Sequence, residues 1–282
     1  MSKNITMTTT FLLIKLSRPV NVLISFITII IAAELAGSLN PFENVLIAAF
    51  SAALITIGAN VINDYFDIEI DRINKPNRPL AAGTVKRKTA IFYFMMVYFL
   101  AWCLAVYLSI WMFLIAFLTS ILLFFYSYRL KRTVLWGNLT VSFATAMAFV
   151  YGGVAVGHYN ETFFPASFAF LFHFGREILK DIQDIEGDKQ AGAHTLPIIY
   201  GISKSLKLIL VDFILLVFLT AIPYILGIYG IRYFLIICLG IYPVLLFVLI
   251  RSRKDNSPNS LGYLSNLLKA DMVIGLLAIY LK

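Results

Sequence analysis

A run of 40 consecutive uncharged residues, from 89 to 128, limits what this chain can fold into more than any other feature. A helix that crosses a bilayer needs about 20 apolar residues, so the run is long enough for two crossings. It therefore predicts a hairpin of two transmembrane helices. The composition agrees along the chain, since 60% of the 282 residues are hydrophobic and 13% are charged, which excludes an ordinary water-soluble domain.

The same criterion of length and hydropathy predicts nine membrane-spanning helices. They are expected near residues 17–37, 43–63, 89–108, 110–128, 136–157, 162–181, 206–227, 232–250 and 262–281. We therefore predict an all-α, polytopic membrane protein with a single domain, 1–282, whose nine helices form a bundle around a central cavity with cytoplasmic cap loops. The first apolar segment is too long for a signal peptide and lacks a small-residue cleavage site, so it is predicted to be a retained helix.

The basic residues are distributed unevenly between the two sides of the predicted bundle. A formal net charge of +8 would suit a nucleic-acid partner, but only Arg232 and Lys282, of 23 lysines and arginines, fall on the side opposite the N-terminus. Basic residues of membrane proteins concentrate in cytoplasmic loops. We thus expect a multi-pass protein of the cell membrane with its N-terminus in the cytoplasm and its C-terminus outside. Its partner is expected to be the lipid bilayer and no nucleic acid.

Two acidic segments, 117 residues apart, have nearly the same sequence and align without a gap. They are Asp64-Tyr-Phe-Asp67-Ile-Glu69-Ile-Asp71-Arg72 and Asp181-Ile-Gln-Asp184-Ile-Glu186-Gly-Asp188-Lys189. Together with Glu177 they hold nine of the 15 acidic residues. Carboxylates this concentrated repel one another unless a cation lies among them, so the segments predict a pair of divalent-metal sites, with Mg²⁺ as the cofactor.

The two acidic segments are expected to face each other. Both follow a span that runs toward the cytoplasm, and aspartates spaced i, i+3 and i+7 lie along one face of a helix. Solvated helix ends are the alternative, but solvation requires no particular spacing. Metal ions held in this way favour a polyanionic substrate such as a diphosphate. The predicted catalytic and metal-binding residues are Asp64, Asp67, Asp71, Asp181, Asp184 and Asp188.

Basic and aromatic residues near the acidic segments are candidates for binding such a substrate. Arg78 lies in a turn-rich loop after the first segment, where it is placed to touch a phosphate. Lys131 follows the fourth predicted span, and its simplest interpretation is a cytoplasmic anchor with interfacial tyrosines. Beside a diphosphate site, Lys131 becomes a phosphate ligand and Tyr126 or Tyr128 a neighbour of the reacting carbon. Asn138, just downstream, is placed to assist them.

The two acidic segments resemble the signatures of the UbiA superfamily of intramembrane prenyltransferases. The first matches Asn63-Asp64-Tyr-Phe-Asp67-Ile-Glu-Ile-Asp71 and the second matches Asp184-Ile-Glu-Gly-Asp188. The resemblance implies that the aspartates hold magnesium, that Asn63 binds diphosphate or orders a carboxylate, and that Arg78 and Lys131 bind phosphate oxygens. Three residues at the start of the first span are expected near the acceptor. The full substrate-binding set is Asn60, Asn63, Arg78, Tyr126, Lys131, Arg18, Asn21 and Lys15.

Within that family, the longer strings around both signatures are most similar to archaeal lipid prenyltransferases. The resemblance implies transfer of a geranylgeranyl group from geranylgeranyl diphosphate to geranylgeranylglyceryl phosphate, which forms the second ether bond of archaeal membrane lipids. An aromatic prenyltransferase of quinone biosynthesis, acting on 4-hydroxybenzoate or a related acceptor, is the alternative within the family. A cation transporter is the alternative from another class, although it would favour single acids near the membrane midplane. The oligomeric state is left open.

Overall fold

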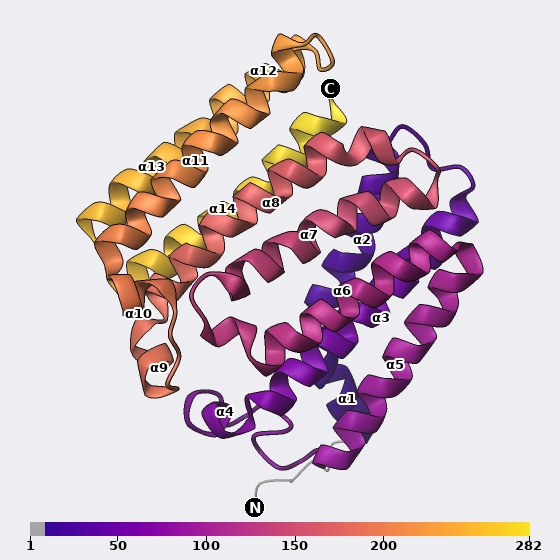
Figure 1. Cartoon of the computed structure of the whole chain (residues 1–282), viewed down its shortest axis with the longest axis vertical. Coiled ribbons are helices and arrows are strands. Elements are labelled where there is room, and N and C mark those ends of the chain that lie inside the picture. The colour runs from indigo at the N-terminus through magenta and orange to yellow at the C-terminus, as the bar shows by residue number, and fades with distance from the viewer. Residues whose placement is uncertain (1–8) are drawn as a thin grey trace, which may run out of the picture.

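The computed structural model describes residues 9–282, except for the side chains of residues 73 and 74, and all regular structure in this range is helical (Figure 1). In chain order the elements are α1 (Thr9–Ser17), α2 (Pro19–Leu35), α3 (Phe42–Phe66), α4 (Ile68–Asn74), α5 (Arg87–Leu108), α6 (Ile110–Tyr128), η1 (Leu130–Arg132), α7 (Trp136–Ala155), η2 (Tyr159–Thr162), α8 (Phe163–Gln183), α9 (Ile185–Gln190), α10 (Leu196–Tyr200), α11 (Ile202–Ile225), α12 (Ile231–Ile236), the π-helical η3 (Ile237–Ile241), α13 (Tyr242–Lys254) and α14 (Pro258–Tyr280).

The uncharged run forms the predicted hairpin, α5 and α6, with Ser109 as its turn. The hydroxyl of Ser109 accepts a hydrogen bond from the backbone N–H of Met112 at 3.1 Å. This bond caps the N-terminus of α6, so a new helix begins directly after α5. Large apolar side chains such as Phe99 and Trp111 lie exposed on these two helices. Apolar surface of this kind suits contact with lipid, so the chain is a polytopic membrane protein.

The number of spans differs from the prediction. Between residues 9 and 282, seven helices are long and apolar enough to cross a membrane, and the pair α1 and α2, bent by 54°, makes eight. The prediction of nine is therefore not confirmed. Helix α8 lies where the sixth span was expected, at 162–181, but its last two turns carry Arg176, Glu177, Lys180 and Asp181. These charges lower its mean hydropathy below that of an ordinary span.

The helices surround a cavity of about 820 Å³. One apolar core packs within α7, α8 and the helices that follow, and a second packs among α2, α3, α5, α6 and α7. The cavity lies between these two cores and is lined by side chains from α2, α3, α6, α7, α8, α11, η3 and α14. The predicted bundle around a central cavity is thus present.

The two acidic segments lie at the same end of the bundle, where α4 and α9 sit, and the C-terminus lies at the opposite end (Figure 1). The expectation that each segment is one continuous helix is wrong. α3 ends before Asp67, where φ is −97° and ψ is 5°, and α8 ends before Asp184, where φ is −96° and ψ is 9°. The two segments therefore share a backbone conformation as well as a sequence, because each helix breaks at the middle aspartate of its segment.

Candidate active site at the junction of the two acidic segments

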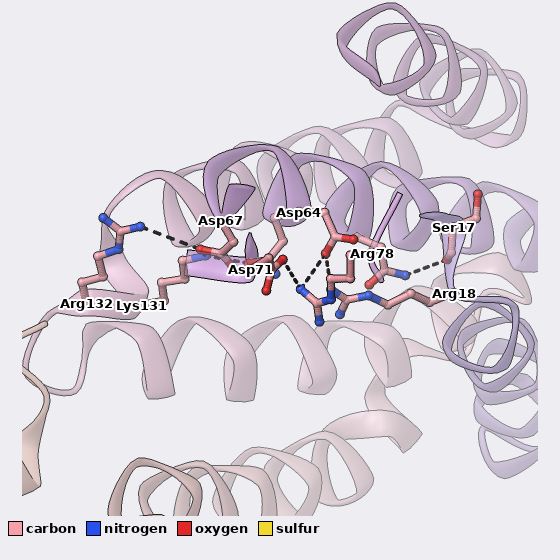
Figure 2. Close-up of polar contacts among 10 residues, drawn as sticks. Ser17, Arg18, Asp64, Asp67, Asp71, Arg78, Lys131 and Arg132 are labelled. Carbon is pink, nitrogen blue, oxygen red and sulfur yellow. Dashed lines mark hydrogen bonds and ion pairs between the residues drawn. The ribbon is translucent and has the colours of Figure 1, made fainter. Parts of the chain in front are cut away.

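The first acidic segment is bound by arginines from two other parts of the chain. Arg78 donates from Nη1 to Asp71 at 2.6 Å and to Asp64 at 3.1 Å, and Arg18 also pairs with Asp64 (Figure 2). Both carboxylates are almost completely buried, so the guanidinium groups compensate their charge. The loop containing Arg78 folds back over the end of α3, as the position of its guanidinium in Figure 2 shows.

The middle aspartate of this segment binds a different set of cations. Asp67 accepts from Lys131 Nζ at 2.5 Å, and Arg132 lies 3.7 Å away. The same ammonium donates to the side-chain oxygen of Asn63 at 2.9 Å. Burial lowers the pKa of Lys131, and the carboxylate of Asp67 opposes this change. A Cβ on Gly137 would lie 2.8 Å from the Cα of Lys131, so this close approach of η1 to α7 requires glycine.

The elbow between α1 and α2 brings Arg18 to this cluster. Arg18 has a φ of 55°, a left-handed conformation that costs free energy for any residue other than glycine. The preceding residue, Ser17, holds the elbow in place: its carbonyl accepts from the amide of Asn60 at 2.9 Å and its hydroxyl lies 2.8 Å from that of Tyr93. Asn60, predicted to bind substrate, thus uses its side-chain N–H to position α1.

The other two candidates near the first span lie away from the aspartates. Lys15 donates from Nζ to the backbone carbonyl of Asn77 at 3.0 Å, which ties α1 to the loop that carries Arg78. Asn21 lies one turn into α2 and lines the central cavity. Lys15 therefore holds the loop that carries Arg78, whereas the side-chain amide of Asn21 lies at the cavity.

The second acidic segment has fewer cationic partners. Asp181 accepts from the side-chain amide of Asn138 at 2.8 Å, and Asp184 is exposed. The pKa of Asp188 is raised to about 6, first by burial and then by the neighbouring charge of Asp184. The charges of Lys180 and Lys131 compensate the carboxylate of Asp188 only in part, so a further cation beside it would favour its ionised form.

The two segments meet around Tyr126 and Lys131. The hydroxyl of Tyr126 lies within electrostatic range of Asp67 from the first segment and of Asp181 and Asp188 from the second. Lys131 pairs with Asp67, and its charge also acts on Asp188. A backbone hydrogen bond of 2.8 Å from His194 to Arg132 joins the loops that follow η1 and α9. The facing arrangement predicted from the repeat is therefore what the chain adopts.

The donor set suits magnesium, but no preformed cage exists. In the described part of the chain, no three acidic, histidine or cysteine side chains lie close enough to share one metal ion. Carboxylate oxygens are nevertheless the ligands that Mg²⁺ prefers, and this ion usually keeps several waters and binds through one or two carboxylates together with substrate phosphates. The under-compensated pair Asp184 and Asp188 therefore fits a hydrated Mg²⁺ ion.

Several cations near this site were not among the sequence candidates. Arg132 is the neighbour of a predicted residue, and its place beside Asp67 depends on the turn of η1. Arg176, Lys180 and Lys269 line the central cavity. A basic residue inside a predicted span is itself an unusual signal, because charges within a membrane are costly and face cavities or partners. That signal was available in the sequence for all three, since Arg176 and Lys180 lie in the predicted span 162–181 and Lys269 lies in 262–281.

Comparison with known proteins agrees with this geometry. The sequence matches the UbiA prenyltransferase family over residues 23–267. It is 36% identical over 265 residues to the digeranylgeranylglyceryl phosphate synthase of Methanosphaera stadtmanae, which covers 93% of this chain and 95% of that protein. It is 42% identical over 193 residues to the protein of the same name from Pyrococcus furiosus, with coverage of 68% and 70%.

Solved structures show the same fold. One, of a digeranylgeranylglyceryl phosphate synthase, has a TM-score of 0.85 and 32% identity and covers 97% of this chain and 98% of that one. Another, of a UbiA homologue from Archaeoglobus fulgidus bound to DMAPP and Mg²⁺, has a TM-score of 0.68 and 20% identity, with coverage of 95% and 98%. With two facing aspartate segments, a sequence match over most of its length and this shared fold, the chain belongs to the UbiA prenyltransferase family.

Proposed function

We propose that this protein transfers a geranylgeranyl group from geranylgeranyl diphosphate to the free hydroxyl of geranylgeranylglyceryl phosphate. The observation that carries the proposal is the site itself, in which two acidic segments and their cations meet at one end of an apolar cavity of about 820 Å³. Relatives that are 36% identical over 93% of the chain are digeranylgeranylglyceryl phosphate synthases, and this similarity supports the choice of substrates.

The diphosphate binds among the cations of the first segment. Three cations already pair with the carboxylates of the first acidic segment, namely Arg18, Arg78 and Lys131. Their N–H groups are suited to phosphate oxygens. The side chain of Asn63 holds the ammonium of Lys131 in position. When bound, Mg²⁺ would neutralise the diphosphate and make it a better leaving group, held by Asp64, Asp67, Asp71, Asp181, Asp184 and Asp188 directly or through water.

The reaction exchanges one carbon–oxygen bond for another. The bond between C1 of the prenyl group and the diphosphate breaks, and its electron pair leaves with the diphosphate. The hydroxyl oxygen of the acceptor forms the new bond to C1, and the hydroxyl proton passes to an oxygen base in the site. Tyr126 lies between the two segments, and its aromatic ring is the proposed stabiliser of the allylic cation.

The site is proposed to face the cytoplasm, with nine helices crossing the membrane. α8 is 21 residues long and packs between α7 and α11, so it runs beside full spans. Its charged turns lie at the end that carries the acidic segments, where they meet the site rather than lipid. The basic loops of 72–88 and 129–132 lie at that same end, which by the distribution of charge is the cytoplasmic one.

The acceptor is tested in one assay with two substrates. Purified protein with Mg²⁺ and geranylgeranyl diphosphate is offered geranylgeranylglyceryl phosphate and 4-hydroxybenzoate in parallel reactions. We expect product from the glycerol phosphate and none from the benzoate. Prenylation of the benzoate alone would assign the protein to the aromatic prenyltransferases and overturn the proposed acceptor.

A further inference from the structure

Every charged side chain that lines the central cavity, among the residues that the structure describes, is a cation. They are Arg176 and Lys180 from α8 and Lys269 from α14. The remaining wall is apolar apart from hydroxyl and amide groups and the imidazole of His173, so these three residues form a cationic patch in a mostly apolar surface. We call them the cavity cations. None of them belongs to the two acidic segments.

Helix α8 presents its charges on two adjacent faces. The acidic face continues from Glu177 to Asp181 and Asp184, at spacings of four and three residues. Arg176 and Lys180 are also four residues apart, and each is one position before an acidic residue, so they lie about 100° around the helix on the face that lines the cavity. The cavity therefore begins directly beside the second acidic segment.

The charge of this patch is only partly compensated. Glu177 pairs with Arg176 at 3.0 Å and with Lys180 at 3.3 Å, so a single carboxylate is shared between the two cations of α8 that line the cavity. Arg176 also donates to the carbonyl of Ser265 at 3.2 Å, which joins α8 to α14. Lys269 follows Ser265 by one helical turn on the same face, and no carboxylate within residues 9–282 pairs with it.

The net charge of the patch is +2, from three cations and Glu177. An isolated ammonium inside a membrane-spanning helix is costly unless an anion compensates it. A phosphate monoester carries a charge near −2 at neutral pH. The first acidic segment offers no better place for a second phosphate, because Arg18, Arg78 and Lys131 are already engaged there with carboxylates and the diphosphate.

We propose that the cavity cations bind the phosphate of the acceptor lipid, separately from the cations that bind the diphosphate. The inference rests on the proposed function and adds the residues that recognise the acceptor. The cavity walls also include Ile24 and Val273, which are 45% and 67% exposed. An anionic lipid can therefore keep its isoprenoid chain among apolar side chains while its phosphate meets the patch next to the reacting centre.

The test compares kinetics of the wild-type protein with those of Lys269→Met, which removes the ammonium but keeps much of the apolar side chain. The matched control is Lys207→Met, an exposed lysine of a spanning helix that does not line the cavity. We expect Lys269→Met to raise the KM for geranylgeranylglyceryl phosphate by roughly 10- to 100-fold, the range of a lost charge-assisted contact. The KM for geranylgeranyl diphosphate should stay within about 2-fold.

Two further measurements separate phosphate recognition from a general structural effect. Lys269→Arg should restore most of the acceptor affinity, and Lys180→Met should repeat the effect of Lys269→Met. The KM for geranylgeranylglycerol, an acceptor without the phosphate, should be the same for the wild-type protein and for Lys269→Met. The inference is overturned if both methionine variants leave the acceptor KM within about 2-fold of wild type, or raise both KM values equally. Failure of the wild-type protein to use the glycerol phosphate at all would instead refute the proposed function, and the inference with it.

Discussion

Replacement of Arg78 by methionine tests whether its guanidinium and a divalent cation compete for the carboxylates of Asp64 and Asp71. Arg78 bridges Asp64 and Asp71, whose side chains are 3% and 6% exposed. Removing one partner of a buried ion pair costs about 3–5 kcal/mol. Asp64 keeps its contact with Arg18, so we expect the lower end, about 3 kcal/mol, which for a chain of this size lowers Tm by roughly 6 °C.

The matched control is Arg72→Met, the same change six residues away. Arg72 pairs with Glu69 at 2.7 Å, but the two side chains are 55% and 68% exposed, and exposed pairs contribute about 0–1 kcal/mol. Thermal melting of both variants in detergent, with and without Mg²⁺, gives the comparison. Mg²⁺ should raise the Tm of Arg78→Met more than that of wild type, because the ion no longer competes with the guanidinium. Equal melting of the two variants, or equal Mg²⁺ shifts for Arg78→Met and wild type, would refute the reasoning.

Three other perturbations follow from the same geometry. Asp67→Asn and Asp184→Asn keep side-chain volume but remove a carboxylate charge from each acidic segment, so each should lose at least about 100-fold in turnover while folded protein is retained. Full activity of both variants, or activity of the wild-type protein in excess chelator, would contradict the metal proposal. Single cysteines at Asn77 and Gln190, in a background without Cys103 and Cys238, should both be labelled by an impermeant reagent from the cytoplasmic side only, and labelling from opposite sides would separate the two segments. Gly137→Ala forces the backbone of Lys131 to move, so it should weaken geranylgeranyl diphosphate binding more than Gly153→Ala does, which meets a Thr162 methyl at the far end of α7; binding measured by titration at fixed Mg²⁺ distinguishes them.

The repeat of acidic residues predicted where the two segments lie relative to each other because its signal is positional. Both segments follow helices that run in the same direction, so the end of the bundle at which they meet follows from topology. The ion pair of Lys131 with Asp67 and the effect of its charge on Asp188 agree with this. The breaks at Asp67 and Asp184 were not predictable, since neither proline nor glycine lies beside them.

The contacts made by single polar residues were less predictable than the clusters. Asn60 continues the face of Asp64 and was therefore assigned to substrate, but it donates to the carbonyl of Ser17. That contact depends on the bend between α1 and α2, where Arg18 adopts a left-handed conformation that L-residues rarely occupy. Sequence periodicity reports which residues share a face of one helix, and it carries no information about which element packs against that face.

Helix α8 is the predicted span that does not pass the test of length and hydropathy. Hydropathy identifies a span by the absence of charge, whereas α8 carries two cations and two carboxylates in its last two turns. One of its faces supplies Asp181 to the proposed metal site and the adjacent face supplies Arg176 and Lys180 to the cavity. Both faces are buried against protein or the cavity, so the charges need not contact lipid. Because two of its faces carry charged side chains toward the protein interior, α8 lacks the uniformly apolar composition by which hydropathy recognises a span.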